Sequence, residues 1–170
     1  TLPTGWYLAE SDDNANTLYT AGNGSGTAGD TDSFGASGST ERAFGGLLSG
    51  TLVPTNGACF TNGTGSTITS LAVAYTGEEW RLGTASRADR IDFQFSTDAT
   101  SLTTGTWTDV DALDFSTPTT TATGAKDGNA AANRTAISST IAALSIANGA
   151  TVWIRWTDFN ASGADDGLAV

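Results

Sequence analysis

Apolar and polar residues alternate with period two in several segments of this chain. The segment RIDFQFSTD alternates around Ile91, Phe93 and Phe95, and TVWIRWTDF and ITSLAVAYTG repeat the pattern. Successive side chains of a strand point to opposite faces, so this alternation predicts half-buried β-strands. In TVWIRWTDF the pattern places Trp156 toward the core and Trp153 on the outer face.

Shorter apolar runs and turn-forming clusters fill the rest of the chain. The runs include GWYLAE, RAFGGLLSGTLV, ACFTN, TWTDVDAL and ALSI, and clusters such as TNGTGS, ANGA and NASGADDG separate them. Gly, Asn, Ser and Asp favour turns. About eight to ten short strands joined in this way predict an all-β fold, an antiparallel β-sandwich of the jelly-roll type with long Gly/Thr/Asn-rich loops. The length of 170 residues fits one domain, residues 1–170.

Two segments are less regular. The alanines in NAAANRTAISSTIAAL favour helix, but Ser, Thr and Ile interrupt them, so we expect at most a short helix or turn with Ile137 and Ile141 pointing inward. Residues 19–39 are rich in glycine and contain Phe34 midway. This pattern indicates a long ordered loop held by one aromatic side chain, with a disordered linker as the alternative.

Composition and charge narrow the class of protein. Only 15% of residues are charged, the net charge is −11, and Lys126 is the only lysine. Nucleic-acid binding depends on Lys and Arg, so we expect no nucleic-acid partner. A surface of hydroxyls and amides is typical of a secreted or cell-surface protein, and no apolar run is long enough to insert into a membrane. The sequence also has no signal peptide, so we expect a mature chain or one excised from a longer secreted protein.

The residue types that catalysis needs are scarce. The chain has no histidine and a single cysteine, Cys59, in a strand-like context. These facts exclude Ser-His and Cys-His nucleophiles and a disulfide within the chain, and we expect Cys59 to be a buried, inert thiol. Glu78 and Glu79 are neighbours that face opposite sides of a strand, so they do not form a glycosidase pair. We therefore predict that the chain is not an enzyme.

Two pairs of aspartates are candidates for metal binding. Asp165 and Asp166 occupy a Gly-flanked turn after a strand, and Asp30 and Asp32 have alternate spacing that points both carboxylates to one side. Calcium prefers several oxygen ligands, so the four together predict a calcium site. The alternative is that Asp165 caps its own turn through a hydrogen bond to the backbone.

Aromatic and basic side chains suggest a binding face. Sugar rings stack on exposed aromatic rings, so Trp153 and Arg155, on one face of a strand, are predicted ligand-binding residues. The alternative is that a loop covers Trp153. Other charged residues are expected to form cross-strand ion pairs that set strand register, in the segments ERAF (Glu41 and Arg42) and GEEWRL (Glu78, Glu79 and Arg81). Arg87 and Arg90 are expected to pair with Asp89 and Asp92.

Several longer phrases occur together: STERAFGGL, YTGEEWRLG, DRIDFQFSTDATSLTTGTWTDVDAL, GNAAANRTA and GATVWIRWTDFNASGADDGLAV. They resemble an accessory β-sandwich module of large secreted bacterial proteins, the type found beside extracellular endonuclease/exonuclease/phosphatase and cadherin-like domains. The strand and loop phrase FQFSTDATSLTTGTWTDV is also similar to lectin-like and MAM-like jelly rolls, which bind sugars or mediate adhesion, commonly with calcium.

The resemblance implies a non-catalytic extracellular module for adhesion or carbohydrate binding, stabilised by calcium, with a glycan or cell-surface polymer as partner. The alternative is a structural subunit of an extracellular filament, sheath or surface layer that assembles by β-strand complementation. Modules of this type usually continue with a closing apolar strand after the DDGLAV phrase. We therefore expect an unpaired edge strand at the C-terminus, which another copy of the chain completes.

Overall fold

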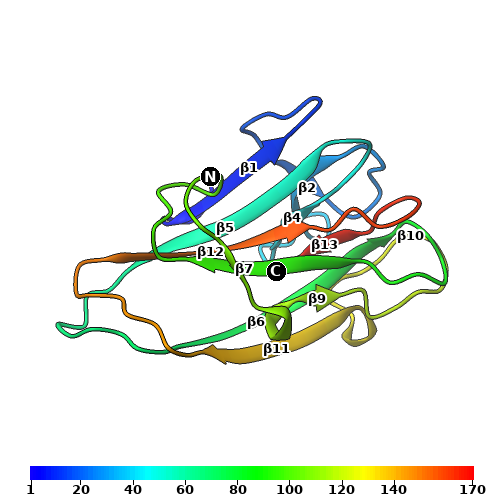
Figure 1. Cartoon of the computed structure of the whole chain (residues 1–170). Coiled ribbons are helices and arrows are strands. Elements are labelled where there is room, and N and C mark those ends of the chain that lie inside the picture. Colours follow the sequence, from blue (N-terminus) through cyan, green and yellow to red (C-terminus); the bar gives the residue numbers. More distant parts are fainter.

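The computed structural model describes residues 1–170 as thirteen strands and two short 3-10 helices (Figure 1). The strands outnumber the predicted eight to ten because five of them, β2, β8, β9, β10 and β13, contain only two or three residues. No helix has the length and apolar character needed to cross a membrane. The elements are β1 (Trp6–Ser11), β2 (Thr20–Gly22), β3 (Asp30–Phe34), β4 (Ala43–Leu47), β5 (Val53–Thr61), β6 (Leu71–Leu82), β7 (Arg90–Ser96), β8 (Thr108–Asp109), η1 (Asp111–Leu113), β9 (Phe115–Ser116), β10 (Gly124–Ala125), η2 (Ala131–Asn133), β11 (Arg134–Ile141), β12 (Thr151–Asp158) and β13 (Gly167–Ala169).

The strands form two sheets that pack face to face as a β-sandwich, as the alternation predicted. Sheet 1 has six strands in the order β1-β5-β12-β7-β8, with β9 also paired to β7. Sheet 2 has seven strands in the order β10-β6-β13-β4-β3-β2, with β11 also paired to β6. All pairs are antiparallel except β2 with β3. The sandwich therefore follows the predicted fold class with one parallel pair at an edge.

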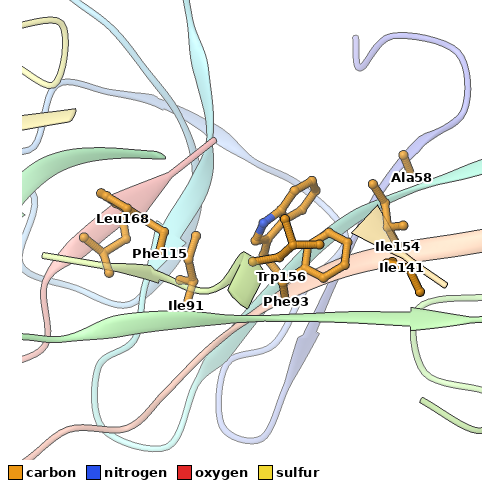
Figure 2. Close-up of a cluster of buried hydrophobic side chains, with 9 residues drawn as sticks. Ala58, Ile91, Phe93, Phe115, Ile141, Ile154, Trp156 and Leu168 are labelled. Atoms are coloured by element: carbon orange, nitrogen blue, oxygen red, sulfur yellow. The ribbon is translucent and has the colours of Figure 1, made fainter. Parts of the chain in front are cut away.

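The core between the sheets is aromatic at its centre. Figure 2 shows Trp156 beside Phe93, and their ring centroids lie 5.4 Å apart at an interplanar angle of 77°. Trp156 also stacks on Trp6 at 6.0 Å. Edge-to-face and offset-stacked rings add to the free energy gained by burial. Alternation placed Ile91, Phe93 and Trp156 inward correctly, because all three belong to this cluster.

The two irregular segments are both ordered. Phe34 is 2% exposed, and its ring stacks on Trp80 with centroids 5.9 Å apart, so the predicted aromatic anchor is confirmed. The segment around it contains β2 and β3 rather than one long loop. In the alanine-rich segment only η2 is helical, and β11 follows it directly. Ile137 and Ile141 pack against the core, as expected.

The prediction of a C-terminal edge strand is wrong. β13 lies inside sheet 2, between β4 and β6, and pairs with both. The short strand is held in place because Leu168 and Ala169 are fully buried, one on each side of the sheet. An unpaired edge does exist near Val170, but it is the edge of β6 from Leu71 to Gly77.

The charged residues of ERAF and GEEWRL do not form the predicted ion pairs. Glu78 accepts a hydrogen bond of 2.9 Å from Trp80 Nε1, and Glu79 accepts one of 2.6 Å from the hydroxyl of Thr119. Neutral donors bind one oxygen of each carboxylate, and Oε1 of Glu79 is buried without a partner. The second prediction of pairing is confirmed, because the salt bridges of the chain are Arg87–Asp89, Arg87–Asp166 and Arg90–Asp92.

Candidate functional site

Four aspartates gather where the chain crosses from sheet 1 to sheet 2. Asp158 ends β12, Asp89 precedes β7, and Asp165 and Asp166 precede β13. Antiparallel pairing of β12 with β7 sets Asp158 opposite Ile91, which brings the start of β7 to the end of β12. All four are buried, with exposed fractions between 0% and 7%. Asp165 and Asp166 were predicted as metal ligands and Asp89 as an ion-pair partner of Arg87, whereas Asp158 was not predicted.

Hydrogen bonds from the surrounding loops hold this aspartate cluster. Asp166 accepts from the backbone N–H of Gly83 at 2.7 Å and from the hydroxyl of Thr117 at 2.6 Å. Asp89 accepts from the N–H of Asp166 at 2.9 Å. Asp165 accepts from the N–H of Ala161 at 2.9 Å, within its own turn. The turn-capping interpretation of Asp165 is therefore confirmed, and the cluster fastens the connection between the sheets.

The cluster contains one positive charge. Arg87 lies 3.2 Å from Asp89 Oδ2 and 3.6 Å from Asp166 Oδ1. Burial raises the pKa of Asp165 and of Asp166, and raises that of Asp158 well above its ordinary value, and the neighbouring carboxylates add to the rise. Oδ1 of Asp158 is buried and has no hydrogen-bond partner. The folded structure therefore disfavours the charged form of these three carboxyl groups.

The structure does not bring the four predicted calcium ligands together. Asp30 and Asp32 lie on β3, in a groove on sheet 2, and not beside Asp165 and Asp166. No group of three or more Asp, Glu, Cys or His side chains is placed to hold a metal ion. In the aspartate cluster, backbone N–H groups and Thr117 already occupy most carboxylate oxygens. Asp158 Oδ1 is the buried oxygen that is left for a cation.

A polar groove lies beside Asp30 and Asp32. It encloses about 410 Å³ between the β2–β3 connection and the face of sheet 2, and Arg81 reaches across to donate to the carbonyl of Gly24 at 3.1 Å. Gly24 has φ +80°, and a Cβ there would lie 1.7 Å from the carbonyl oxygen of Trp80, so the connection needs glycine at this point. Lining residues are Thr20–Gly29, Asp30, Asp32, Phe34, Leu47, Arg81 and Gly167.

The two carboxylates converge on one hydroxyl. Oγ1 of Thr20 lies 2.8 Å from Asp32 Oδ1 and 3.3 Å from Asp30 Oδ2. The alternate spacing therefore does point both side chains to one side, as predicted. Burial raises the pKa of both carboxyls, and the charge of Glu10 raises them further. Thr20 was not predicted as part of this site. It reaches Asp32 through the parallel pairing of β2 with β3, and no sequence pattern near Thr20 indicates that pairing.

Trp153 and Arg155 lie on the outer face of sheet 1, as alternation predicted, but a loop covers Trp153. Its side chain is 6% exposed and packs against Ala99 and Leu102. The guanidinium of Arg155 lies 4.0 Å from the ring centroid of Trp107 and donates to Gln94 at 2.6 Å. The alternative interpretation of Trp153 as a covered residue is thus the correct one, and Arg155 fixes the loop.

Two more residues complete this outer face. Tyr7 is 44% exposed, and its ring centroid lies 4.8 Å from that of Trp153, so it is the accessible aromatic of the pair. Cys59 packs under the same loop and is half-buried rather than fully buried. Burial raises the pKa of its thiol, which disfavours the nucleophilic thiolate.

The strand period of β12 points to Asp158 as a buried residue. In TVWIRWTD the core-facing positions are Val152, Ile154 and Trp156, and the next position of that parity is Asp158. An acidic residue at an inward position of a strand predicts a buried carboxylate with special partners. Asp89 has no such signal, because it lies in a loop before β7.

Comparisons with known proteins give no relative for this chain. No protein-family model matches it, and no curated protein and no solved structure matches it. A function must therefore be inferred from the groove, the aspartate cluster and the sheet edges.

Proposed function

We propose that this chain is a non-catalytic extracellular module that binds carbohydrate, for adhesion or attachment, through the groove between the β2–β3 connection and sheet 2. The observation that carries the proposal is the convergence of Asp30 and Asp32 on the hydroxyl of Thr20 inside this groove. A sugar hydroxyl that lies beside Thr20 can donate a hydrogen bond to the same two carboxylates. Ligand sites commonly enclose about 300–1,000 Å³, and the groove volume of about 410 Å³ falls in that range.

The lining supports a neutral polyhydroxyl ligand. Carboxylates accept hydrogen bonds from hydroxyls, and Asn23, Ser25 and Thr27 add side chains that both donate and accept. Two acidic side chains in the groove and a net charge of −11 oppose an anionic ligand. Neutral glycans are therefore favoured over acidic ones.

Affinity measurements with neutral polysaccharides test this proposal. The variant Asp30→Asn/Asp32→Asn keeps the shape of the groove and removes charge-assisted hydrogen bonds, each worth about 1.5–3 kcal/mol. In affinity electrophoresis through gels that contain the polysaccharide, we expect the double variant to be retarded less than the wild type. Its affinity should be at least about tenfold lower. Asp12→Asn/Asp13→Asn, which removes the same number of charges at an exposed turn, is the matched control and should bind as the wild type does.

Two results would contradict the proposal. One is the absence of binding across a panel of neutral glucans, mannans, galactans and chitin oligomers. The other is binding that the double variant leaves unchanged, since the ligand would then occupy another face.

A further inference from the structure

The first half of β6 has a strand on one side only. β11 pairs with β6 from Leu71 to Glu78, and β13 pairs with the other side only between Glu78 and Arg81. The second edge of β6 is therefore unpaired from Leu71 to Gly77. Because β13 is in line with this edge, the gap has the position of a strand that continues in the direction of β13.

The backbone groups of β6 that face the gap follow from the pairing of Val170. Val170 and Phe44 exchange hydrogen bonds of 3.1 and 2.9 Å, so the polar groups of Val170 point toward β4. Along a strand these groups alternate in direction, which turns those of Ala169 toward Glu78 of β6. The same alternation along β6 directs the N–H and C=O groups of Thr76, Ala74 and Ala72 into the gap. These are the groups that a further strand would pair with.

An apolar groove lies beneath the gap. It encloses about 420 Å³, and sheet 1 contributes part of its lining through Ile154 and Trp156. Phe60, at its rim, is 51% exposed. We call this feature, the free edge of β6 with the groove beneath it, the β6 slot; its lining residues are Trp6, Phe60, Leu71, Ala72, Val73, Ala74, Tyr75, Ile154, Trp156 and Val170.

We propose that the β6 slot binds an extended strand of a different polypeptide, antiparallel to β6, with apolar side chains at alternate positions and neutral or basic side chains between them. Side chains opposite Tyr75 and Val73 point into the groove, because those two residues pack against the core. Side chains opposite Thr76 and Ala74 point outward, since both residues are exposed. Main-chain hydrogen bonds supply affinity, and the groove selects for alternation.

Charge decides between a second copy and a different partner. Each chain carries a net charge of −11, so two copies repel one another. A neutral or basic strand meets no such repulsion and gains from the negative field of the chain. The occupant is therefore expected to come from a partner of different composition.

Binding of a synthetic peptide tests the proposal. The probe is a labelled peptide of about seven residues in which Val and Ile alternate with Thr and Lys. The control peptide has the same composition with the apolar residues placed together. We expect fluorescence anisotropy to show binding of the first peptide and at least about tenfold weaker binding of the second. Amide hydrogen exchange should slow at Ala72, Ala74 and Thr76 when the first peptide binds.

Three variants locate the site. Phe60→Ser removes apolar surface at the rim, and Ala74→Pro removes one N–H that faces the slot while the pairing with β11 is kept. Both should weaken peptide binding. Phe159→Ser is the matched control, because Phe159 is similarly exposed at 44% and lies outside the slot. Fusion of the same peptide directly after Val170 should raise the melting temperature and abolish binding of free peptide.

The proposal is overturned if both peptides bind equally, if the exchange of Ala72, Ala74 and Thr76 does not change, or if the fused strand leaves the melting temperature unaltered. Self-association of the chain that Phe60→Ser and Ala74→Pro both abolish would also overturn it, because a second copy would then fill the slot. Since Asp30 and Asp32 lie outside the slot, these results are independent of the carbohydrate proposal.

Discussion

The backbone N–H of Leu48 donates a hydrogen bond of 3.1 Å to Oδ2 of Asp158, while the other oxygen of that carboxylate is buried without a partner. The two residues are 110 positions apart, and the bond joins the end of β4 to the end of β12. One oxygen thus fastens the two sheets together, and the other lies buried without a partner near three further aspartates, where burial raises the pKa of the carboxyl.

We expect Asp158→Asn to stabilise the folded chain at neutral pH. The amide oxygen can still accept from Leu48, and the amide N–H₂ group removes the buried charge and offers donors to the neighbouring carboxylates. Relief of an unsatisfied buried group is worth about 1–3 kcal/mol. Thermal unfolding at pH 7.5 should show a higher melting temperature than that of the wild type, with Asp13→Asn unchanged. A lower melting temperature would mean that the charged carboxylate stabilises the fold.

Stability should also increase on mild acidification. Folding raises the pKa of a set of carboxyl groups chiefly through burial, among them Asp158, Asp165, Asp166 and Glu79. A group whose pKa is higher in the folded state binds protons there first, so its contribution to stability is complete below its unfolded pKa and is lost as pH rises through the folded pKa. The ordinary value for Asp is 3.8.

The free energy of unfolding should therefore be larger at pH 5 than at pH 8, the reverse of the usual acid sensitivity of proteins with ion-paired carboxylates. Urea denaturation at the two pH values measures it. In Asp158→Asn the difference between pH 5 and pH 8 should shrink, because one of the titrating groups is gone. Greater stability at pH 8 would contradict the assigned direction of the pKa shifts.

Calcium is predicted to stabilise the chain through the aspartate cluster. Asp158 Oδ1 is the oxygen without a partner, and a cation bound to it would offset the repulsion from Asp89 and Asp165. Since no three acidic side chains are in place, the other oxygen ligands would have to come from backbone carbonyls or water. Melting temperatures should be higher in calcium than in chelator for the wild type and equal for Asp158→Asn. Identical melting curves of the wild type under both conditions would rule out a calcium site.

The strands of the two sheets could be predicted from the sequence wherever buried and exposed side chains alternate along the strand. Ile91, Phe93 and Trp156 fall inward because the strand period alone decides their direction. β8 lies within the predicted run TWTDVDAL. Strands β9 and β10 could not be predicted, because two residues show no period and pair only where a longer strand is already present. The position of β13 inside sheet 2 depends in the same way on β4 and β6.

The candidate site was predictable only in its sequence-local parts. Alternate spacing placed Asp30 and Asp32 on one side, but the hydroxyl between them comes from Thr20 through a parallel pair. Ion pairs were predicted for Glu78 and Glu79 from nearby arginines, yet a carboxylate accepts from any donor within reach. The indole of Trp80 and the hydroxyl of Thr119 are such donors, and the latter is distant in sequence.

Arg155 is expected to stabilise the loop over Trp153 rather than to bind ligand. Its contacts with the ring of Trp107, with Gln94 and with the carbonyl of Leu102 are all within the chain. Arg155→Ala removes a cation–π contact and hydrogen bonds, so we expect a loss of about 2 kcal/mol in the free energy of unfolding and easier quenching of tryptophan fluorescence by acrylamide. Arg155→Lys keeps the charge without the planar guanidinium, so its free energy of unfolding should lie between that of the wild type and that of Arg155→Ala. Glycan affinity should stay that of the wild type in both variants. A variant with unchanged stability and lost glycan binding would instead make Arg155 the ligand-binding residue that the sequence predicted, and would move the binding face from sheet 2 to sheet 1.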